Sequence, residues 1–391
     1  KLKAAPSGLV EAALDAMTKS LDPHSGFMNG QEFRESFVHT KGEFGGLGIE
    51  VTMQDGLVKV VAPIEDTPAA RAGMQSGDLI VQVDGEPIKG LSLAQAVRRM
   101  RGRPGEAIDL LVRREGHADF MVQIVRAIIK VRAVRWQNMG SVAYIRVSRF
   151  SERVQSGIAK AFTDIRKELG RAPTGVILDL RNNPGGLLDQ SIVLADAFLD
   201  DGEIVSVRGR TSSNQRSFLA SDGDLAAGIP MIILVNGGSA SASEIVASAL
   251  KYHNRATIMG TQTFGKGSVQ TIIPMPREGA LRLTTALYFG ADGHTIQARG
   301  VLPDILIESK KPPVSKGRRE SDLPGAIPAE KDVLKQAVTP KIFVTNCPAA
   351  VAPRRTGRER KEDRMLGCAL TYLATGSKEK FLAAHGVQRQ M

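Results

Sequence analysis

The sequence predicts an α/β protein with a core of alternating strands and helices, a smaller inserted module and a helical N-terminal region. Three observations support this prediction. Strand patterns alternate with amphipathic helix patterns between residues 133 and 308. Short strand patterns and short helix patterns alternate between residues 46 and 115, at a spacing typical of a small compact domain. Residues 1–41 carry apolar side chains at helical spacing. A chain of 391 residues can hold these as separate domains.

The N-terminal region, residues 1–41, is expected to be helical. Apolar residues recur at helical spacing from Leu9 to Met17. The segment Leu21-Asp22-Pro23-His24-Ser25-Gly26 interrupts this helix, because proline and glycine disfavour helix interiors. A second helix is then expected over Gln31 to Phe37.

A glycine cluster opens the module expected over residues 42–132. Short helices are expected over Pro68 to Gly73 and Ser92 to Met100, with Ser92 as the N-cap of the second. Strands are expected over Ile49 to Val51, Leu57 to Val61, Asp78 to Gly85 (ending in a turn) and Ile108 to Val112.

The core is expected over residues 133–308. Its helices are predicted over Ser151 to Leu169, Leu187 to Leu199 and Ser241 to Tyr252. Its strands are predicted over Val142 to Val147, Gly175 to Leu180, Ile204 to Val207, Met231 to Val235, Thr257 to Gly260, Ser268 to Ile273 and Leu281 to Phe289.

Residues 309–391 are expected to form a basic, Pro-rich tail that is partly disordered or helical, with one short helix over Asp332 to Val338. The tail holds 17 Lys and Arg against 8 Asp and Glu, so most of the net charge of +11 lies there. A basic tail of this kind is usually solvated or membrane-surface sequence, and no nucleic-acid partner is expected. Cys347 and Cys368 either pair in an oxidising compartment or are incidental, and their spacing matches no metal site.

Three serines in the segment Gly238-Ser239-Ala240-Ser241-Ala242-Ser243 are candidate nucleophiles. A buried strand enters this segment through a glycine turn and a helix leaves it, which is a geometry that presents a serine at a helix N-terminus. The alternative is that Ser239, Ser241 and Ser243 only cap the helix and pack.

Lys266 favours the catalytic interpretation. It lies between Gly265 and Gly267 and between two strand patterns, an unusual position for a solvated lysine. A neutral lysine amine can act as a general base once burial lowers its pKa from about 10.4. Gln270 lies four residues further on, so in a strand it faces the same side and can orient the amine.

Two rival interpretations of the same region are weaker. Gly260 to Lys266 has the spacing of a phosphate-binding loop, but Gly267 stands where such a loop has Ser or Thr, and a strand follows instead of a helix. A histidine base would have to be His253 or His294, and both are expected at the surface.

Two glycine segments are candidate binding loops. Asp179 to Gly186 follows a buried strand, and the N–H of Gly185 or Gly186 could oppose that of Ala242 to form an oxyanion hole. Gly46-Leu47-Gly48-Ile49 opens the module, and successive amides in such a loop can hold a terminal carboxylate while the strand edge pairs with the peptide.

Together these segments resemble the carboxy-terminal processing, or tail-specific, proteases of the S41 serine peptidase family. The resemblance covers residues from about 10 to 307. It is carried by Asp22-Pro23-His24-Ser25, Gly46-Leu47-Gly48-Ile49, Asp179 to Gly186, Ser239 to Ile245, Thr263 to Gln270 and Gly300-Val301-Leu302-Pro303-Asp304.

The resemblance implies a serine endopeptidase with Ser241 as nucleophile, Lys266 as general base and Gln270 as its orienter. It implies a crotonase-like α/β core, a PDZ domain that binds protein or peptide substrate C-termini, and an N-terminal region used in dimerisation. It further implies an exported protein of the periplasm or cell envelope, without cofactor or metal; a homodimer or higher oligomer and an adaptor protein are compatible with it. Tyr252 departs from the family, which usually has an aspartate there.

Two other functions are compatible with parts of the sequence. One is a catalytically inactive PDZ scaffold that binds protein C-termini, which the complete set of Ser241, Lys266 and Gln270 argues against. The other is a crotonase-type acyl-CoA enzyme, which explains neither the PDZ module nor the Ser-Lys pair.

Overall fold

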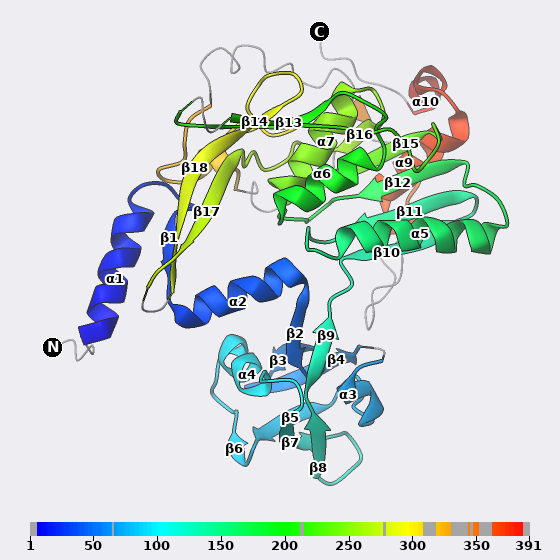
Figure 1. Ribbon diagram of the computed structural model, residues 1–391. Helices are drawn as coiled ribbons and strands as arrows, with labels where there is room; N and C mark the ends of the chain where they lie inside the picture. Colours follow the sequence, from blue (N-terminus) through cyan, green and yellow to red (C-terminus); the bar gives the residue numbers. More distant parts are fainter. Residues whose placement is uncertain are drawn as a thin grey trace. The chain divides into compact units, whose positions relative to one another are not determined.

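The computed structural model describes residues 6–64, 66–211, 215–276, 279–307, 318–329, 343–344, 347–351 and 362–385. The described residues fall into two compact units (Figure 1). The smaller unit spans 42–131, and the larger unit comprises the described residues of 6–41, 132–351 and 362–385. None of the helices that the structure describes combines the length and apolar character needed to span a bilayer.

A seven-stranded sheet forms the centre of the larger unit, in the order β10-β11-β12-β15-β16-β19-β20. The first pair is antiparallel and all later neighbours are parallel. The strands are β10 (Val134–Met139), β11 (Val142–Val147), β12 (Gly175–Asp179), β15 (Met231–Val235), β16 (Thr257–Gly260), β19 (Ile305–Ile307) and β20 (Phe343–Val344). Helices α5 (Val154–Leu169), α6 (Leu188–Asp196) and α7 (Ala242–Tyr252) lie in the connections between them. The predicted α/β core is thereby confirmed.

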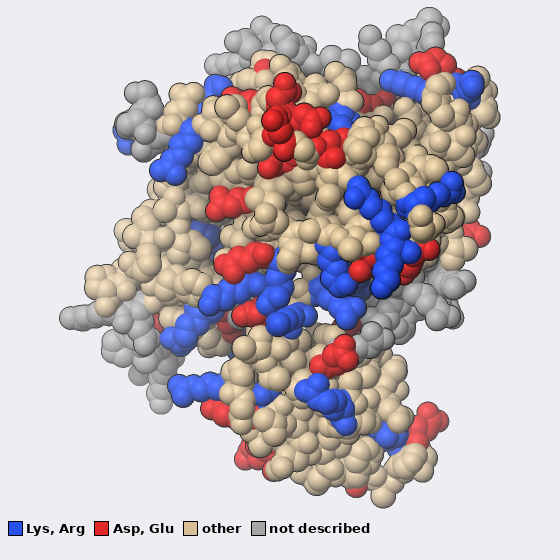
Figure 2. Space-filling model, turned by 45° about the vertical axis from the view of Figure 1, so that its right-hand side comes forward, with Lys and Arg blue, Asp and Glu red and all other residues tan. Residues whose placement is uncertain are grey.

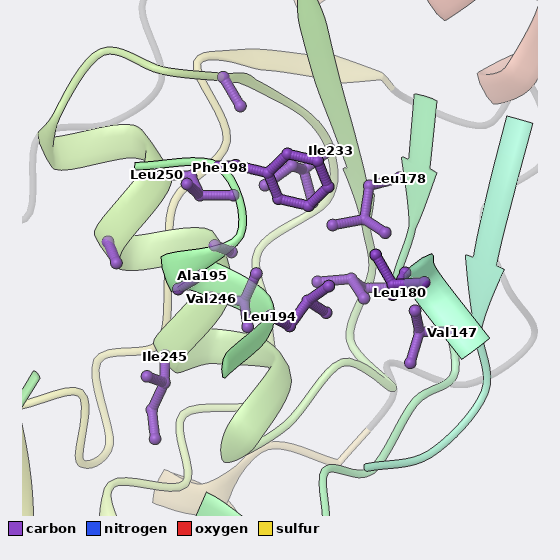
Figure 3. Close-up of a cluster of buried hydrophobic side chains, with 14 of the residues drawn as sticks. Val147, Leu178, Leu180, Leu194, Ala195, Phe198, Ile233, Ile245, Val246 and Leu250 are labelled. Carbon is purple, nitrogen blue, oxygen red and sulfur yellow. The ribbon is translucent and has the colours of Figure 1, made fainter. Parts of the chain in front are cut away.

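Side chains of the central strands alternate between two apolar clusters, because successive side chains of a strand point to opposite faces. Val176 and Leu178 of β12 join the cluster under α5, α6 and α7, part of which is shown in Figure 3. Ile177 joins the cluster on the other face. That second cluster also contains residues of two C-terminal helices, α9 (Arg364–Thr375) and α10 (Lys378–Ala384). Cover on both faces explains why these strands read as continuous apolar runs.

A second, antiparallel sheet of the larger unit carries the N-terminal region. Its order is β1-β18-β13-β14, with β17 also paired to β18. The strands are β1 (Gly26–Met28), β13 (Glu203–Gly209), β14 (Gln215–Leu219), β17 (Ser268–Pro274) and β18 (Ala280–Gly290). Helices α1 (Pro6–Lys19) and α2 (Gly30–Lys41) precede and follow β1 (Figure 1). The chain from the N-terminal turn therefore enters the same sheet as the segment that follows Lys266.

The smaller unit is built on a sheet in the order β3-β4-β5-β7-β8. Its strands are β3 (Ile49–Gln54), β4 (Leu57–Pro63), β5 (Leu79–Val83), β6 (Glu86–Pro87, paired with β5), β7 (Ala107–Arg113) and β8 (Phe120–Val125). A separate pair joins β2 (Glu43–Gly46) to β9 (Ala127–Lys130). The helices are α3 (Pro68–Arg71) and α4 (Leu93–Met100). Ser92 caps α4 by accepting the N–H of Gln95, as predicted.

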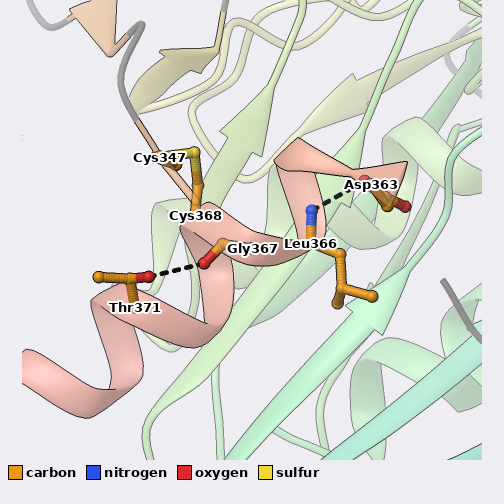
Figure 4. Close-up of a disulfide and its surroundings, with 6 residues drawn as sticks. All are labelled: Cys347, Asp363, Leu366, Gly367, Cys368 and Thr371. Atoms are coloured by element: carbon orange, nitrogen blue, oxygen red, sulfur yellow. Dashed lines mark hydrogen bonds between the residues drawn. A yellow bond between two sulfur atoms is a disulfide. The ribbon is translucent and has the colours of Figure 1, made fainter. Parts of the chain in front are cut away.

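The C-terminal part contains two helices whose positions the sequence did not predict. Its two cysteines are paired, which was one of the two alternatives considered. Helices α9 and α10 pack on the central sheet, and a disulfide joins Cys347 to Cys368 of α9 (Figure 4). The described residues also include η2 (Glu320–Asp322), β21 (Ala350–Val351) and β22 (Glu362–Asp363). The helix predicted over Asp332 to Val338 lies outside the described residues.

Charged side chains of both signs lie on the face shown in Figure 2. Largely buried charged side chains also form ion pairs, as in the Arg114–Asp78 bridge of 2.7 Å in the smaller unit and the Arg255–Asp224 bridge of 2.9 Å in the larger one. Such mixing fits the small net charge of the chain outside residues 309–391.

Candidate active site

The turn between β15 and α7 carries the three candidate serines. Strand β15 ends at Val235, and α7 begins at Ala242. Ser241, directly before the helix, has φ 54° and ψ −113°. Few residues other than glycine adopt a positive φ, and strained backbone of this kind is concentrated at functional sites. The conformation is the one expected of a nucleophile held on a sharp strand-to-helix turn.

The hydrogen bonds of the three hydroxyls distinguish the candidates. The Ser239 hydroxyl donates to the carbonyl of Leu180 at 2.8 Å and accepts an N–H from Asn236. The Ser243 hydroxyl donates to the carbonyl of Asn183 at 2.9 Å. The Glu244 N–H, which a capping serine hydroxyl would accept, donates to the Ser241 carbonyl at 2.7 Å, and no hydrogen bond of the Ser241 hydroxyl to a described residue caps α7. Two serines therefore have structural roles, and Ser241 is the one whose hydroxyl is not committed to the scaffold.

A buried carboxylate, that of Glu244, ties the serine turn to the lysine loop. Its Oε2 accepts the N–H of Ser241 at 2.7 Å and the N–H of Lys266 at 2.9 Å. Its Oε1 accepts the N–H of Gly265 at 2.6 Å and the hydroxyl of Thr263. Burial raises the pKa of Glu244 to about 7, although the four donors act to lower it. One side chain thus holds the backbones of both candidate catalytic residues.

The amine of Lys266 lies in a partly desolvated environment. Burial is the main reason that its pKa is lowered, and the nearby charge of Arg282 acts in the same direction. The carboxylates of Glu320, Glu244 and Asp22 oppose that shift. A lowered pKa increases the neutral fraction of the amine, which is the form that can accept a proton.

Gln270 contacts Lys266 as the spacing suggested. Lys266 Nζ donates to Gln270 Oε1 at 2.7 Å. Within the described part of the chain, no hydrogen bond joins this amine to the Ser241 hydroxyl. The structure therefore brings the two loops together through Glu244, and the amine itself is held by Gln270.

The glycine segment after β12 approaches the serine turn closely. A side chain at Gly185, which has φ 100°, would lie 3.0 Å from Ser241 Cβ and 3.1 Å from Ala242 N. The Gly185 N–H donates to Asn183 Oδ1 at 2.9 Å, so it is already engaged. The N–H groups of Gly186 and Ala242 have no hydrogen-bond acceptor among the described residues.

The two histidines considered as bases do not lie at this turn. His253 is the C-cap of α7, at the opposite end of the helix from Ser241, and its ring bonds the carbonyl of Glu203 at 2.8 Å. His294 lies in an exposed turn, where its N–H donates to Asp292. A histidine-based triad is therefore not assembled around Ser241.

Sequence reasoning assigned no role to several residues that the structure places around this site. Glu244 could have been found, because a glutamate three residues after an N-cap serine is the signature of a capping box. Asp22 and Thr284 contact the Gln270 side of the site, and Glu320 contacts His24 and Gln297 behind the lysine loop. These contacts join segments far apart in the sequence, so no local pattern signals them.

The candidate carboxylate-binding loop lies in the smaller unit. Gly48 has φ 82°, and its carbonyl accepts the N–H of Ile64 at 2.8 Å and the hydroxyl of Thr67 at 3.1 Å. The Leu47 side chain is buried in the core of the unit, beside residues of α4. Strand β3, which begins at Ile49, lies at an end of its sheet and pairs only with β4 among the described strands. Among the described strands, one edge of β3 therefore has no strand partner.

The family models that match the chain agree with this architecture. The model of peptidase family S41 matches residues 141–307, and a PDZ domain model matches 59–114. A carboxy-terminal-processing protease of Bartonella bacilliformis is 51% identical over 333 residues, covering 83% of this chain and 76% of that protein. A probable CtpA-like serine protease of Staphylococcus epidermidis is 34% identical over 306 residues, covering 78% of this chain and 61% of that protein. Among solved structures, the photosystem II D1 C-terminal processing protease is 29% identical, with a TM-score of 0.46, covering 75% of this chain and 81% of that one.

The α/β core, the serine turn and the PDZ domain thus define a serine-type peptidase. The chain belongs to peptidase family S41 and, within it, to the carboxy-terminal processing proteases.

Proposed function

We propose that this peptidase cleaves proteins with a Ser-Lys dyad after its PDZ domain has bound their C-terminal tails. One observation carries the proposal: Glu244 holds the N–H groups of Ser241 and Lys266 on a single oxygen, at 2.7 and 2.9 Å. A hydroxyl free of the scaffold and an amine of lowered pKa are thereby anchored to the same buried group.

In this mechanism the neutral Lys266 amine takes the proton of the Ser241 hydroxyl as the oxygen attacks the peptide carbonyl. The amine then protonates the departing amino group, and an acyl-enzyme remains. Water, deprotonated by the same amine, attacks the ester and releases the new C-terminus. A movement of the Lys266 side chain toward Ser241 precedes the first step, and Gln270 Oε1 keeps accepting one N–H of the amine during it.

The oxyanion of the tetrahedral intermediate binds between the N–H groups of Ala242 and Gly186. Ala242 contributes the N-terminus of α7, whose dipole favours negative charge. We favour Gly186 over Gly185 because the N–H of Gly185 is engaged by Asn183. Loss of one such donor typically lowers the rate by about 10²–10³.

Substrate tails bind the PDZ domain at the edge of β3 that lies opposite β4. The extended tail adds as a further strand, and its carboxylate is held by backbone N–H groups of the loop Gly46-Leu47-Gly48-Ile49. The half-buried side chains of Ile49 and Val51 offer apolar surface at this edge, and those of Leu93 and Val97 belong to the same core. Tails ending in apolar residues are the matching ligands.

The protein acts in an exported compartment, the periplasm or cell envelope. The Cys347–Cys368 disulfide supports this, because such bonds persist in oxidising environments. Self-association through the N-terminal region and use of an adaptor protein accord with the exposed apolar side chains of Leu9, Val10 and Met17 on α1.

Cleavage of tail-swapped substrates tests this function. Unstructured reporter proteins that differ only in their last three residues are incubated with the wild type, and mass spectrometry identifies the products. Ser241-dependent cleavage that requires an apolar tail supports the proposal. Binding of the tails without any cleavage would instead support the inactive scaffold.

A further inference from the structure

The N-terminal turn Asp22-Pro23-His24-Ser25 is built against the segment that holds Lys266. It lies directly before β1, which pairs with Ala280–Arg282 of β18. Strand β13 pairs with the same edge of β18 as β1 does, but only from Ala286 onward, so residues 283–285 lie between the two partner strands. The gap between these partners is occupied by the turn, because the N–H of Thr284 donates to the Ser25 hydroxyl at 3.1 Å.

A chain of hydrogen bonds runs from this turn to the lysine amine. The Thr284 hydroxyl donates to Asp22 Oδ1 at 2.9 Å. Gln270 Nε2 donates to Thr284 Oγ1 at 3.2 Å and to Ser268 Oγ at 3.0 Å. Gln270 Oε1 in turn accepts from Lys266 Nζ at 2.7 Å.

The direction of each bond in this chain is set by Asp22. Burial would raise the pKa of Asp22, but hydrogen bonds from Ser25, His24 and Thr284 lower it, so the carboxylate is ionised. An ionised carboxylate can only accept, so the Thr284 hydroxyl must donate to it and can only accept from Gln270. The amide therefore presents its NH₂ group to Thr284 and its oxygen to Lys266.

This direction matters for a lysine that acts as a base. A carbonyl oxygen accepts an N–H of the amine and leaves the nitrogen lone pair of the neutral form unoccupied. The reversed amide would donate an N–H to that lone pair and block it. The orientation of Gln270 thus decides whether the neutral amine can accept a proton.

We propose that Asp22, acting through Thr284, is a positioning residue that keeps the Gln270 oxygen on Lys266 and so keeps the lysine lone pair free. The N-terminal turn is then part of the catalytic apparatus, although neither Asp22 nor Thr284 contacts a reacting atom. The proposal rests on Lys266 as the base of the proposed function.

The test compares four variants, each first checked for folding by circular dichroism. Asp22→Asn replaces a group that can only accept by an amide that can present either its oxygen or its NH₂ group to Thr284. Thr284→Val interrupts the series of hydrogen bonds without changing charge. Thr284→Ser retains the hydroxyl and serves as the conservative variant. Asp15→Asn makes the same chemical change in an exposed aspartate of α1, which pairs with Lys19.

Cleavage of an unstructured reporter peptide is measured against pH. Asp22→Asn and Thr284→Val should each lower the kcat plateau by about 10-fold to 100-fold with little change in KM, because the amine is misdirected and substrate binding is untouched. Thr284→Ser and Asp15→Asn should remain near wild type. The negative charges of Asp22, Glu320 and Glu244 raise the pKa of Lys266, and the positive charge of Arg282 lowers it. Asp22→Asn removes one of the negative charges, so the acidic limb of the pH–activity profile should also move to lower pH.

Competitive labelling of amines with acetic anhydride, read by mass spectrometry, gives a measurement independent of cleavage. The plateau reactivity of Lys266 should fall in Asp22→Asn and Thr284→Val and persist in Thr284→Ser. Wild-type plateaus in Asp22→Asn, or equal losses in Thr284→Ser and Thr284→Val, would overturn the proposal. If instead the proposed Ser-Lys function were wrong, cleavage would persist in the Ser241→Ala variant.

Discussion

The carboxylate of Glu244 accepts the backbone N–H of Lys266 at 2.9 Å and is fully buried. The same oxygen accepts the N–H of Ser241, so the positions of the nucleophile turn and of the base loop depend on one side chain. Because an amide has one acceptor oxygen where a carboxylate has two, this arrangement is sensitive to the smallest substitution.

Glu244→Gln should therefore be costly for both stability and activity. Whichever way the new amide is turned, its NH₂ group faces two donors, which is expected to cost about 3 kcal/mol of unfolding free energy. Cleavage should fall by about 100-fold because both loops shift. Chemical denaturation and kcat measure the two effects. The matched control is Glu11→Gln on an exposed face of α1, and equal behaviour of the two variants would contradict the role of Glu244.

The three serines of the turn should respond differently to alanine substitution. Ser241→Ala should abolish cleavage with folding intact, because its hydroxyl is not part of the scaffold. Ser239→Ala should keep most activity but lower the unfolding free energy by about 1–3 kcal/mol, because the Asn236 N–H loses its acceptor and the Leu180 carbonyl loses one of its two donors. Cleavage rates and thermal unfolding separate the cases. An active Ser241→Ala enzyme would remove the basis of the mechanism.

Lys266→Met should abolish cleavage while making the fold more stable. The pKa of Lys266 is lowered mainly by burial, so the folded state pays a desolvation cost wherever the amine is charged. At pH 6 the variant is expected to gain about 1 kcal/mol of unfolding free energy.

The sign of the pH dependence follows from the same lowered pKa. Below the folded-state pKa of Lys266, the amine is charged in both the folded and the unfolded state, and the folded state bears the full desolvation cost. As pH rises from there toward the unfolded value, the folded state loses its proton first, so the wild type gains stability and the difference from Lys266→Met shrinks. Denaturation at several pH values measures this. A constant difference would show that burial of the charge is not the cause. Activity of the wild type should rise over the same range, because the neutral amine is the base.

Removal of the disulfide should reduce stability without reorganising the active site. The Cys347–Cys368 bond closes a loop with a sequence separation of 21, and its absence should cost about 2–4 kcal/mol. The double variant Cys347→Ser, Cys368→Ser should show a lower Tm and an unchanged kcat at 25 °C. Reduced wild type is the control, and it should unfold at the same temperature as the double variant.

The hydrophobic pattern of the sequence predicted those strands and helices in which apolar residues recur at a regular spacing. The strand Gly175 to Leu180 and the helix Ser151 to Leu169 have counterparts in β12 and α5, and Ser92 caps α4. The strand-to-helix turn expected to carry the candidate serines lies between β15 and α7. In each case the deciding residues are close neighbours in the sequence.

What the sequence did not reveal depends on distant partners. Continuous apolar runs in β12 and β15 implied that both faces of the sheet are buried. On one face the burying residues come from α9 and α10. These helices lie in a tail that is rich in Lys and Arg, so their apolar residues were not recognised. The link from Asp22 to Thr284 spans 262 residues. Such a contact exists only once the second sheet has formed, so no window of sequence contains both ends.

The guanidinium of Arg181 joins two carboxylates, Asp179 at the end of β12 and Asp363 at the N-terminus of α9, each at 2.7 Å. A recombinant fragment trimmed to residues 141–307, the span of the peptidase model, would keep only the first of these. It would also uncover Ile177, Ile232 and Leu234 on the face that α9 and α10 shield. With this apolar face exposed, the fragment would be expected to aggregate. A fragment for expression should therefore extend beyond α10.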